Sequence, residues 1–373
     1  MKESHYQVVV LGAGVAGLSA ALALAQQGIK VAVFDKQTAQ KQSFGECVHG
    51  TMQPILAELK LFDSFIKDAH FELQGYQIDW DKLGHHERSL ITSPYGTGWI
   101  LNREKFDTSL ISAAIEAGVD IFWQSRLTEF SEQSDGWQLH FMQPDTSQYV
   151  VESNFIVDAT GRARTLTRKL NIAEKKGDSL VACCAHLNHS GSGAIARQEA
   201  VIHSSLNGWW YLAPFSNNKA TLCYFTDNDL DMPKTFSELV ELAYEHASLA
   251  LYLDSCDLND NAQMKITPAY SSCIAKSVGN NWLAVGDASC SYDPLSSYGI
   301  TSALGSAFYA SKAITHWFIG QPQYLKEYEA LMQDSFLSYL PKKNEEYEKV
   351  TQFNSPFWQR RNLNQPFHQL TKE

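Results

Sequence analysis

The chain has 373 residues, 44% of them apolar and 12% aromatic, which is enough to bury one large core or two moderate ones. Its net charge of -11 would repel a phosphate backbone and no run of Lys or Arg forms a basic stripe, so a nucleic-acid partner is not expected. The seven cysteines include no Cys-x-x-Cys pair and no zinc-ligand spacing, which predicts reduced thiols, a cytoplasmic protein and no bound metal. Neither a signal peptide nor a run of roughly 20 apolar residues is visible, so neither secretion nor integral membrane association is expected.

The first part of the chain predicts alternating strands and helices. The expected elements, in order, are a strand at 7–11, a helix at 15–27, a strand at 31–34, a helix at 103–118 and a strand at 119–123. Gly28 ends the first helix and Asp35 follows the second strand. This order predicts β-α-β units with right-handed crossovers.

The second part changes in character. The expected elements are a β-meander at 126–151, strands at 155–157, 180–187, 199–205, 209–214, 221–225 and 282–285, and helices near 236–247, 297–318 and 324–347. The alternating segments between 178 and 270 predict an antiparallel sheet with a covering helix. On the strand at 180–187, alternation places Cys184 on the face opposite Cys183, where it is expected to line a cavity.

A glycine-rich turn joins the first strand to the first helix. Gly12, Gly14 and Gly17 form a GxGxxG motif, and Asp35 ends the next strand 18 residues further on. Glycine permits the tight turn and lets backbone N–H groups approach a pyrophosphate, while the helix N-terminus adds positive charge. Asp35 is suited to accept the ribose hydroxyls. The motif predicts a dinucleotide site and does not by itself distinguish NAD from FAD.

Three later segments favour FAD over NAD. Residues 102–110, 158–161 and 285–288 resemble, in this order, segments of FAD-dependent monooxygenases, halogenases and geranylgeranyl reductases. The resemblance implies an α/β fold with a Rossmann-like FAD-binding domain of the glutathione-reductase/p-hydroxybenzoate-hydroxylase type, an antiparallel-sheet substrate domain and C-terminal helices. The expected division is a discontinuous FAD-binding domain at 1–72, 100–177 and 271–320, a substrate domain at 73–99 and 178–270, and a C-terminal helical segment at 321–373.

The resemblance also implies roles for individual residues. Arg103 would lie against the FAD phosphates, and Asp287 would bind the ribityl chain or the pyrophosphate; the alternatives are a solvated arginine and a plain turn aspartate. Backbone amides from Ser297 to Ile300 would face the flavin ring, an arrangement compatible with Ser296 or Ser297 as the helix N-cap. The implied cofactor-binding residues are Gly12, Gly14, Gly17, Asp35, Glu46, Arg103, Asp158, Gly161, Gly286, Asp287, Tyr298, Gly299 and Ile300.

Candidate catalytic residues come from two segments. Residues 45–47 resemble the Gly-Glu-Ser turn of the same superfamily, with Cys47 in place of serine. An inert buried cysteine and a loop histidine without a chemical role are the alternatives for Cys47 and the nearby His49. The candidate catalytic residues are Pro294, Ser297, Gly299, His49 and Cys47.

Halogenase elements are incomplete. Residues 208–214 resemble the Trp-x-Trp-x-Ile-Pro element of halogenases, but Tyr211 replaces its second tryptophan and Ala213 its isoleucine. Tyr76 stands where the halogenase lysine is expected. These departures argue against halogenation.

The overall pattern looks most like the flavoproteins that mature tryptophylquinone cofactors in amino-acid oxidases. The resemblance implies an FAD-dependent monooxygenase that hydroxylates a tryptophan of a partner, a precursor amino-acid oxidase. Two alternatives stay open: a hydroxylase or reductase of small aromatic molecules, and an FAD-containing binding protein or chaperone. NAD(P)H is expected only as a transient reductant, since no second dinucleotide motif is present. The aromatic-rich last 30 residues, which include Phe353, Phe357, Trp358 and Phe367, are expected to dock either on the body or on a partner.

Overall fold

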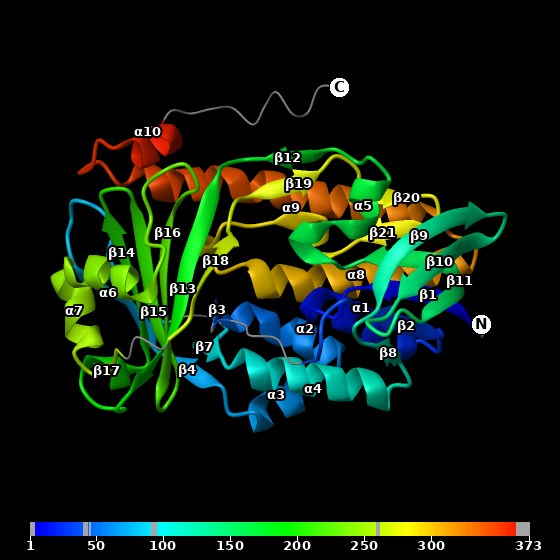
Figure 1. Cartoon of the computed structure of the whole chain (residues 1–373), viewed down its shortest axis with the longest axis horizontal. Helices are drawn as coiled ribbons and strands as arrows, with labels where there is room; N and C mark the ends of the chain where they lie inside the picture. Colours follow the sequence, from blue (N-terminus) through cyan, green and yellow to red (C-terminus); the bar gives the residue numbers. More distant parts are fainter. Residues whose placement is uncertain (1–3, 40–43, 45, 91–94, 259–261, 363–373) are drawn as a thin grey trace.

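The computed structural model describes residues 4–39, 44, 46–90, 95–258 and 262–362, and its center is a twisted sheet whose strands from β21 to β8 are parallel, while the edge strand β20 is antiparallel (Figure 1). The strand order is β20-β21-β11-β1-β2-β8, with β10 and β9 extending from β11. The strands are β1 (Ser4–Leu11), β2 (Val31–Phe34), β8 (Asp120–Phe122), β9 (Arg126–Gln133), β10 (Gly136–Met142), β11 (Gln148–Asp158), β20 (Val278–Gly279) and β21 (Trp282–Ala284).

Side-chain alternation along β1 fills both faces of this sheet. Val8 and Val10 join a core with α1 (Val15–Ala25), α4 (Arg103–Glu116) and α8 (Gly299–Phe318). Val9 and Leu11 face the other side and pack with β9 and β10. Because strands buried on both faces need apolar residues at every position, the unbroken apolar run at the start of the chain forms a central strand.

The second large sheet has the order β17-β13-β16-β15-β14-β5-β6, and β18 also pairs with β13. Its strands are β5 (Gly75–Asp79), β6 (His86–Ser89), β13 (Leu180–His189), β14 (Glu199–Ser205), β15 (Gly208–Ser216), β16 (Lys219–Asp227), β17 (Cys256–Asp257) and β18 (Met264–Pro268). All pairs are antiparallel except β14 with β5, which is parallel. The prediction of an antiparallel sheet is therefore confirmed for every pair of these strands except β14 with β5.

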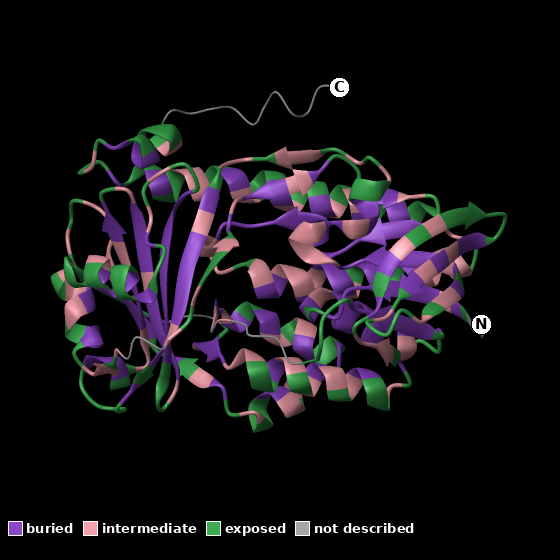
Figure 2. Cartoon of the chain, in the orientation of Figure 1, coloured by how far each residue is buried: buried purple, intermediate pink, exposed green. Residues whose placement is uncertain are grey.

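One face of the second sheet is covered by α6 (Phe236–Tyr244) and α7 (Ala247–Leu253). The helix predicted near 236–247 is found as α6, which ends at Tyr244, and a second helix, α7, follows because His246 has extended φ and ψ angles. The opposite face carries Trp209, Cys184 and Cys223 and looks toward the first sheet. Figure 2 shows that the central strands of both sheets are buried.

Shorter elements complete the fold. The small strands form two three-stranded sheets, β3 (Glu46–Val48), β7 (Gly98–Leu101) and β4 (Phe71–Leu73), and β12 (Glu174–Lys176), β19 (Ser272–Ile274) and β22 (Cys290–Ser291). The remaining helices are α2 (Gln53–Glu58), α3 (Phe62–Lys67), α5 (Thr165–Lys169), α9 (Gln323–Glu348) and α10 (Pro356–Asn362), and the 3₁₀ turns are Gly50–Met52, Gly161–Ala163, Ala194–Arg197, Gly286–Ala288 and Pro294–Ser296. Among the described residues, no helix is long and apolar enough to cross a membrane.

The C-terminal aromatic segment docks on the body as far as the structure describes it. Phe357 and Trp358 on α10 are fully buried, and the Trp358 Nε1 donates a 2.8 Å hydrogen bond to the Ser205 carbonyl. Arg361 pairs with Asp227 at 2.7 Å. Phe367, part of the same predicted segment, lies outside the described residues. The division of the chain into domains stays a prediction.

Sequence and structure agree closely on several elements and differ at the start of α8. The strands predicted at 31–34 and 199–205 are found with those bounds. Helix α8 begins at Gly299, with Tyr298 at its N-cap position, so the prediction of Ser296 or Ser297 as N-cap is wrong. Ser297 has a φ of 50°, a left-handed conformation that ends the preceding 3₁₀ turn instead of starting the helix.

Candidate flavin site

The GxGxxG turn borders a cavity of about 320 Å³ at the carboxyl ends of β1 and β2. Gly12, Gly14, Asp35, Thr160 and Gly161 are among its lining residues. Ligands of open parallel α/β sheets bind at this edge of the sheet.

The three glycines of the motif serve two purposes. Gly12 has a φ of 103°, and a Cβ there would collide with the Ala159 carbonyl. A Cβ on Gly17 would collide with the Gly12 carbonyl, so this glycine permits close packing of helix against turn. By contrast, a Cβ on Gly14 would meet no atom within 4 Å. The open space beside Gly14 and the N-terminus of α1 fits a pyrophosphate.

Asp35 and Asp158 organise the rim of this cavity. The Asp35 carboxylate accepts hydrogen bonds from Ala13 N at 2.7 Å and Gln37 N at 2.8 Å. Asp158 is fully buried and accepts from the backbone amides of Thr160, Leu166 and Thr167. Asp158 therefore acts through the turn that carries Gly161, whereas Asp35 itself lines the cavity.

A second cavity of about 440 Å³ lies between the two large sheets. Its polar end contains Arg103, which contacts Glu46 at 2.6 Å and Asp107 at 3.2 Å. Arg162 and Asp287 form a further ion pair there, at 3.4 Å. The resemblance implies that Arg103 and Asp287 contact FAD. Both residues line this second cavity.

The opposite walls of the second cavity are aromatic and neutral. Trp209 and Phe225 stack at a centroid separation of 3.9 Å, and Cys47 Sγ lies 3.0 Å from the Tyr211 hydroxyl. Burial raises the pKa of Cys47 to about 12, and burial also raises the pKa of Tyr211 well above its ordinary value. Both groups therefore stay protonated at neutral pH, and the wall offers hydrogen-bond donors without charge.

The segment before α8 passes along the second cavity. Pro294, Ser297, Tyr298 and Gly299 line it, whereas Ile300 points into the apolar core. These four cavity residues lie where the resemblance places the flavin ring.

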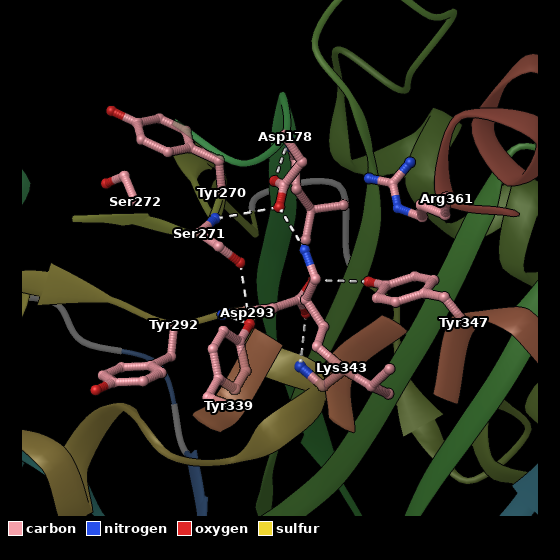
Figure 3. Close-up of polar contacts among 12 residues, drawn as sticks. Asp178, Tyr270, Ser271, Ser272, Tyr292, Asp293, Tyr339, Lys343, Tyr347 and Arg361 are labelled. Atoms are coloured by element: carbon pink, nitrogen blue, oxygen red, sulfur yellow. Dashed lines mark hydrogen bonds and ion pairs between the residues drawn. The ribbon is translucent and has the colours of Figure 1, made fainter. Parts of the chain in front are cut away.

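Buried hydrogen bonds hold this segment in place (Figure 3). The Tyr347 hydroxyl donates to Asp293 Oδ2 at 2.9 Å, and Asp293 N donates to the Tyr339 hydroxyl at 2.8 Å. Lys343, on the same helix, pairs with Asp178 at 3.1 Å. Helix α9 thus contacts both Asp293, in the segment before α8, and Asp178, which lies just before β13 of the second sheet.

Two other predicted residues lie apart from both cavities. Gly286 has a φ of 56°, and a Cβ there would lie 2.7 Å from the Ala16 Cβ, so it permits close packing against α1. His49 packs near Tyr76 with ring centroids 6.4 Å apart, and burial lowers its pKa. Among the described residues, neither belongs to the lining of the two cavities.

Arg162 and Tyr292 were not among the predicted site residues, yet they line the second cavity. Arg162 directly follows Gly161 of the second resembling segment, and Tyr292 lies five residues before Ser297, the first residue expected to face the flavin ring. Cys184 lines the cavity, as strand alternation predicted. Cys223 joins it because β16 pairs with β13 in the register that sets the two cysteines opposite each other.

Comparisons with known proteins agree with this geometry. Residues 5–333 match the family model described as FAD binding domain. A protein of Marinomonas mediterranea named as an FAD-dependent oxidoreductase, LodB, is 26% identical over 362 residues, which cover 95% of this chain and 96% of LodB.

Two solved structures share the fold. The myxobacterial chondrochloren halogenase CndH has a TM-score of 0.87 at 20% identity, covering 98% of this chain and 88% of that one. The peptidyl tryptophan dihydroxylase QhpG has a TM-score of 0.77 at 22% identity, covering 96% of this chain and 79% of that one. The chain therefore belongs to the FAD-binding domain family and is a flavin-dependent oxidoreductase, similar in sequence to halogenases and to a reductase.

Proposed function

We propose that this oxidoreductase is a monooxygenase that hydroxylates a tryptophan side chain of a partner protein, a precursor amino-acid oxidase whose quinone cofactor is being matured. Two similarities support this function. LodB aligns with nearly the full length of the chain, and the fold is shared with QhpG, a peptidyl tryptophan dihydroxylase essential for tryptophylquinone cofactor biogenesis.

The observation that carries the proposal is that one residue, Tyr298, lines both the aromatic cavity and a groove on the surface. Tyr298 is 49% exposed and borders the second cavity. It also borders a groove of about 550 Å³ along α9, lined by Leu295, Tyr339 and Lys342 among others. An indole attached to a polypeptide can therefore enter past Tyr298 while its backbone stays in the groove. The aromatic walls suit an indole ring.

Each part of the site has a role in this reaction. Gly12, Gly14 and Asp35 would hold the adenosine diphosphate half of FAD. Arg103 would neutralise phosphate charge, and the backbone amides at the start of α8 would face the polar edge of the flavin ring. When bound, FAD would supply the oxygen-activating chemistry, with NAD(P)H proposed as the transient reductant. The neutral walls orient the indole and exclude water.

Halogenation receives less support from the cavity. Within the described part of the chain, no lysine lines the second cavity. Tyr76, at the position expected for the halogenase lysine, is buried in an apolar cluster that also contains the cavity residue Cys47.

The test is single-turnover oxidation with mass spectrometry. The flavin-loaded protein is mixed with NADH under air and with a precursor oxidase, whose tryptophan peptide is expected to gain the mass of oxygen. A precursor with that tryptophan replaced by phenylalanine is the matched control. Oxygen incorporated only into free small aromatic molecules would overturn the partner-protein assignment in favour of a small-molecule hydroxylase. Bound flavin with no substrate-dependent NADH oxidation would instead indicate a binding protein.

A further inference from the structure

Two cysteines lie opposite each other in the small sheet formed by β12, β19 and β22. Cys273 and Cys290 are directly paired residues of antiparallel strands, and their sulfur atoms are 3.0 Å apart. Directly opposed residues of antiparallel strands have Cα atoms about 4.5–5.5 Å apart. That spacing falls within the range of about 4.4–6.8 Å that disulfides span. The backbone is therefore already placed for a disulfide.

The two thiols differ in exposure and charge environment. Cys290 is 2% exposed and donates its S–H to Cys273, which is only partly buried. On the other side of Cys273, Lys175 of β12 is its register partner. The hydrogen bond from Cys290 lowers the pKa of Cys273, with help from the positive charges of Arg164 and Lys175, while burial acts in the opposite direction. These contacts favour a thiolate on Cys273 rather than on Cys290, whose S–H is the donor between them.

Other cysteines of the chain lack this combination. Cys184 and Cys223 also face each other, with sulfurs 2.6 Å apart, but both are almost fully buried, and burial raises the pKa of Cys223 well above its ordinary value. Burial raises the pKa of Cys256 to about 11. Geometry alone therefore allows two disulfides, whereas thiolate character and access favour the pair at Cys273.

We propose that Cys273 and Cys290 form a redox-active dithiol site that hydrogen peroxide converts to a disulfide. The Cys273 thiolate attacks one peroxide oxygen, the O–O bond breaks, and the departing hydroxide takes up a proton to leave as water. Cys273 is now a sulfenic acid. The Cys290 sulfur attacks it, the S–S bond forms, the S–O bond breaks, and the Cys290 proton leaves with the second water. In total, two thiols are oxidised and one peroxide is reduced to two waters.

The position of this pair links it to the flavin site. Cys290 lies two residues before Tyr292, which lines the second cavity. A disulfide would link β22 to β19 directly before the residues that lead to α8 and line the second cavity. The inference rests on the thiol geometry and does not depend on the proposed hydroxylation.

The experiment uses the full flavin-loaded chain treated with hydrogen peroxide, alkylated and digested with trypsin without reduction. Cleavage at lysine places Cys273 in peptide 266–276 and Cys290 in peptide 277–312. The expected product is these two peptides joined, with two hydrogens fewer than their sum, and separated again by a reductant. Peptides 266–276 and 277–312 recovered fully alkylated after treatment would overturn the proposal. Exclusive joining of 177–197 to 220–234, the peptides of Cys184 and Cys223, would overturn it as well.

Variants test the assigned roles. Cys290→Ser is expected to leave a sulfenic acid on Cys273 that dimedone traps, while the control Cys256→Ser retains the joined peptides. Lys175→Gln is expected to slow disulfide formation severalfold, whereas Lys176→Gln, one residue further on the same strand, leaves the rate unchanged. Equal rates for the two lysine variants, or no dimedone adduct on Cys273, would contradict the roles given to Lys175 and Cys273.

Discussion

The Tyr347 hydroxyl donates a 2.9 Å hydrogen bond to Asp293, and both side chains are about 1% exposed. The same hydroxyl accepts a 3.0 Å hydrogen bond from Trp209 Nε1. One phenol on α9 therefore joins the segment before α8 to the aromatic wall of the second cavity on β15. Because the Asp293 carboxyl is buried, leaving it without the tyrosine donor is costly.

Replacing Tyr347 with phenylalanine tests this junction. The variant leaves the Asp293 carboxyl and the Trp209 N–H without their shared partner, and we expect the free energy of unfolding to fall by about 1–3 kcal/mol. Urea denaturation measures the change. Tyr244→Phe is the control, because that ring is 40% exposed and its hydroxyl makes only a 3.4 Å contact with Asp254. Equal stability of the two variants would show that the junction contributes little.

Gly14→Val is expected to abolish FAD retention without unfolding the protein. Gly14 has a φ of -85°, which valine adopts readily, and its side chain would enter the space assigned to the pyrophosphate. Absorbance spectra and circular dichroism of the purified variant measure flavin content and fold. Gly305→Ala, where an added Cβ meets only Ile55 at 3.6 Å, is the matched control. A folded Gly14→Val protein with stoichiometric flavin would refute the assignment of this cavity.

Asp35→Ala is expected to weaken FAD binding by roughly 1.5–3 kcal/mol, the scale of a hydrogen bond to a charged group. Asp35→Asn separates two contributions, because the amide keeps an acceptor for Ala13 N while removing the charge. Titration of apoprotein with FAD measures both affinities. Unchanged affinity in the alanine variant would reject a role for Asp35 in recognising the ribose.

His70 predicts a specific pH dependence of stability. Its side chain is fully buried between Phe65 and Phe106, and burial lowers its pKa to about 4, although Asp68 acts in the opposite direction and Lys105 reinforces the shift. The unfolded chain takes up a proton near pH 6.5, whereas the folded chain does so only near pH 4. The contribution of His70 to the free energy of unfolding is therefore complete above about pH 6.5 and is lost as the pH falls toward about 4.

The variant His70→Phe removes this proton. Relative to the unmodified protein, its free energy of unfolding is expected to improve by up to about 3 kcal/mol as the pH falls through this interval. Urea titrations at a series of pH values measure the difference. His70→Asn separates the effect of charge from that of packing. Like His70→Phe it has no titrating ring, so both variants are expected to show the same pH dependence of stability, but asparagine lacks the aromatic contacts with Phe65 and Phe106. Parallel stability curves for His70→Phe and the unmodified protein would disprove the effect.

Much of the FAD-binding half was predictable from local patterns. An apolar run followed by GxGxxG and Asp35 specifies strand, turn, helix and strand within a few dozen residues, because each element obeys its own periodicity. Helix α4 was predicted for the same reason and is found from Arg103 to Glu116. The break between α6 and α7 was missed, since His246 carries no proline or glycine signal.

Sequence alone thus determined the α/β class, the glycine turn and the order of elements, all of which depend on neighbours along the chain. Only the tertiary structure decided which distant residues share a site. Arg162 meets Asp287 across 125 positions, and Tyr347 reaches Asp293 across 54, because sheet order and helix packing set these contacts. The pairing of Cys273 with Cys290 likewise depends on the register of two short strands, which no local pattern encodes.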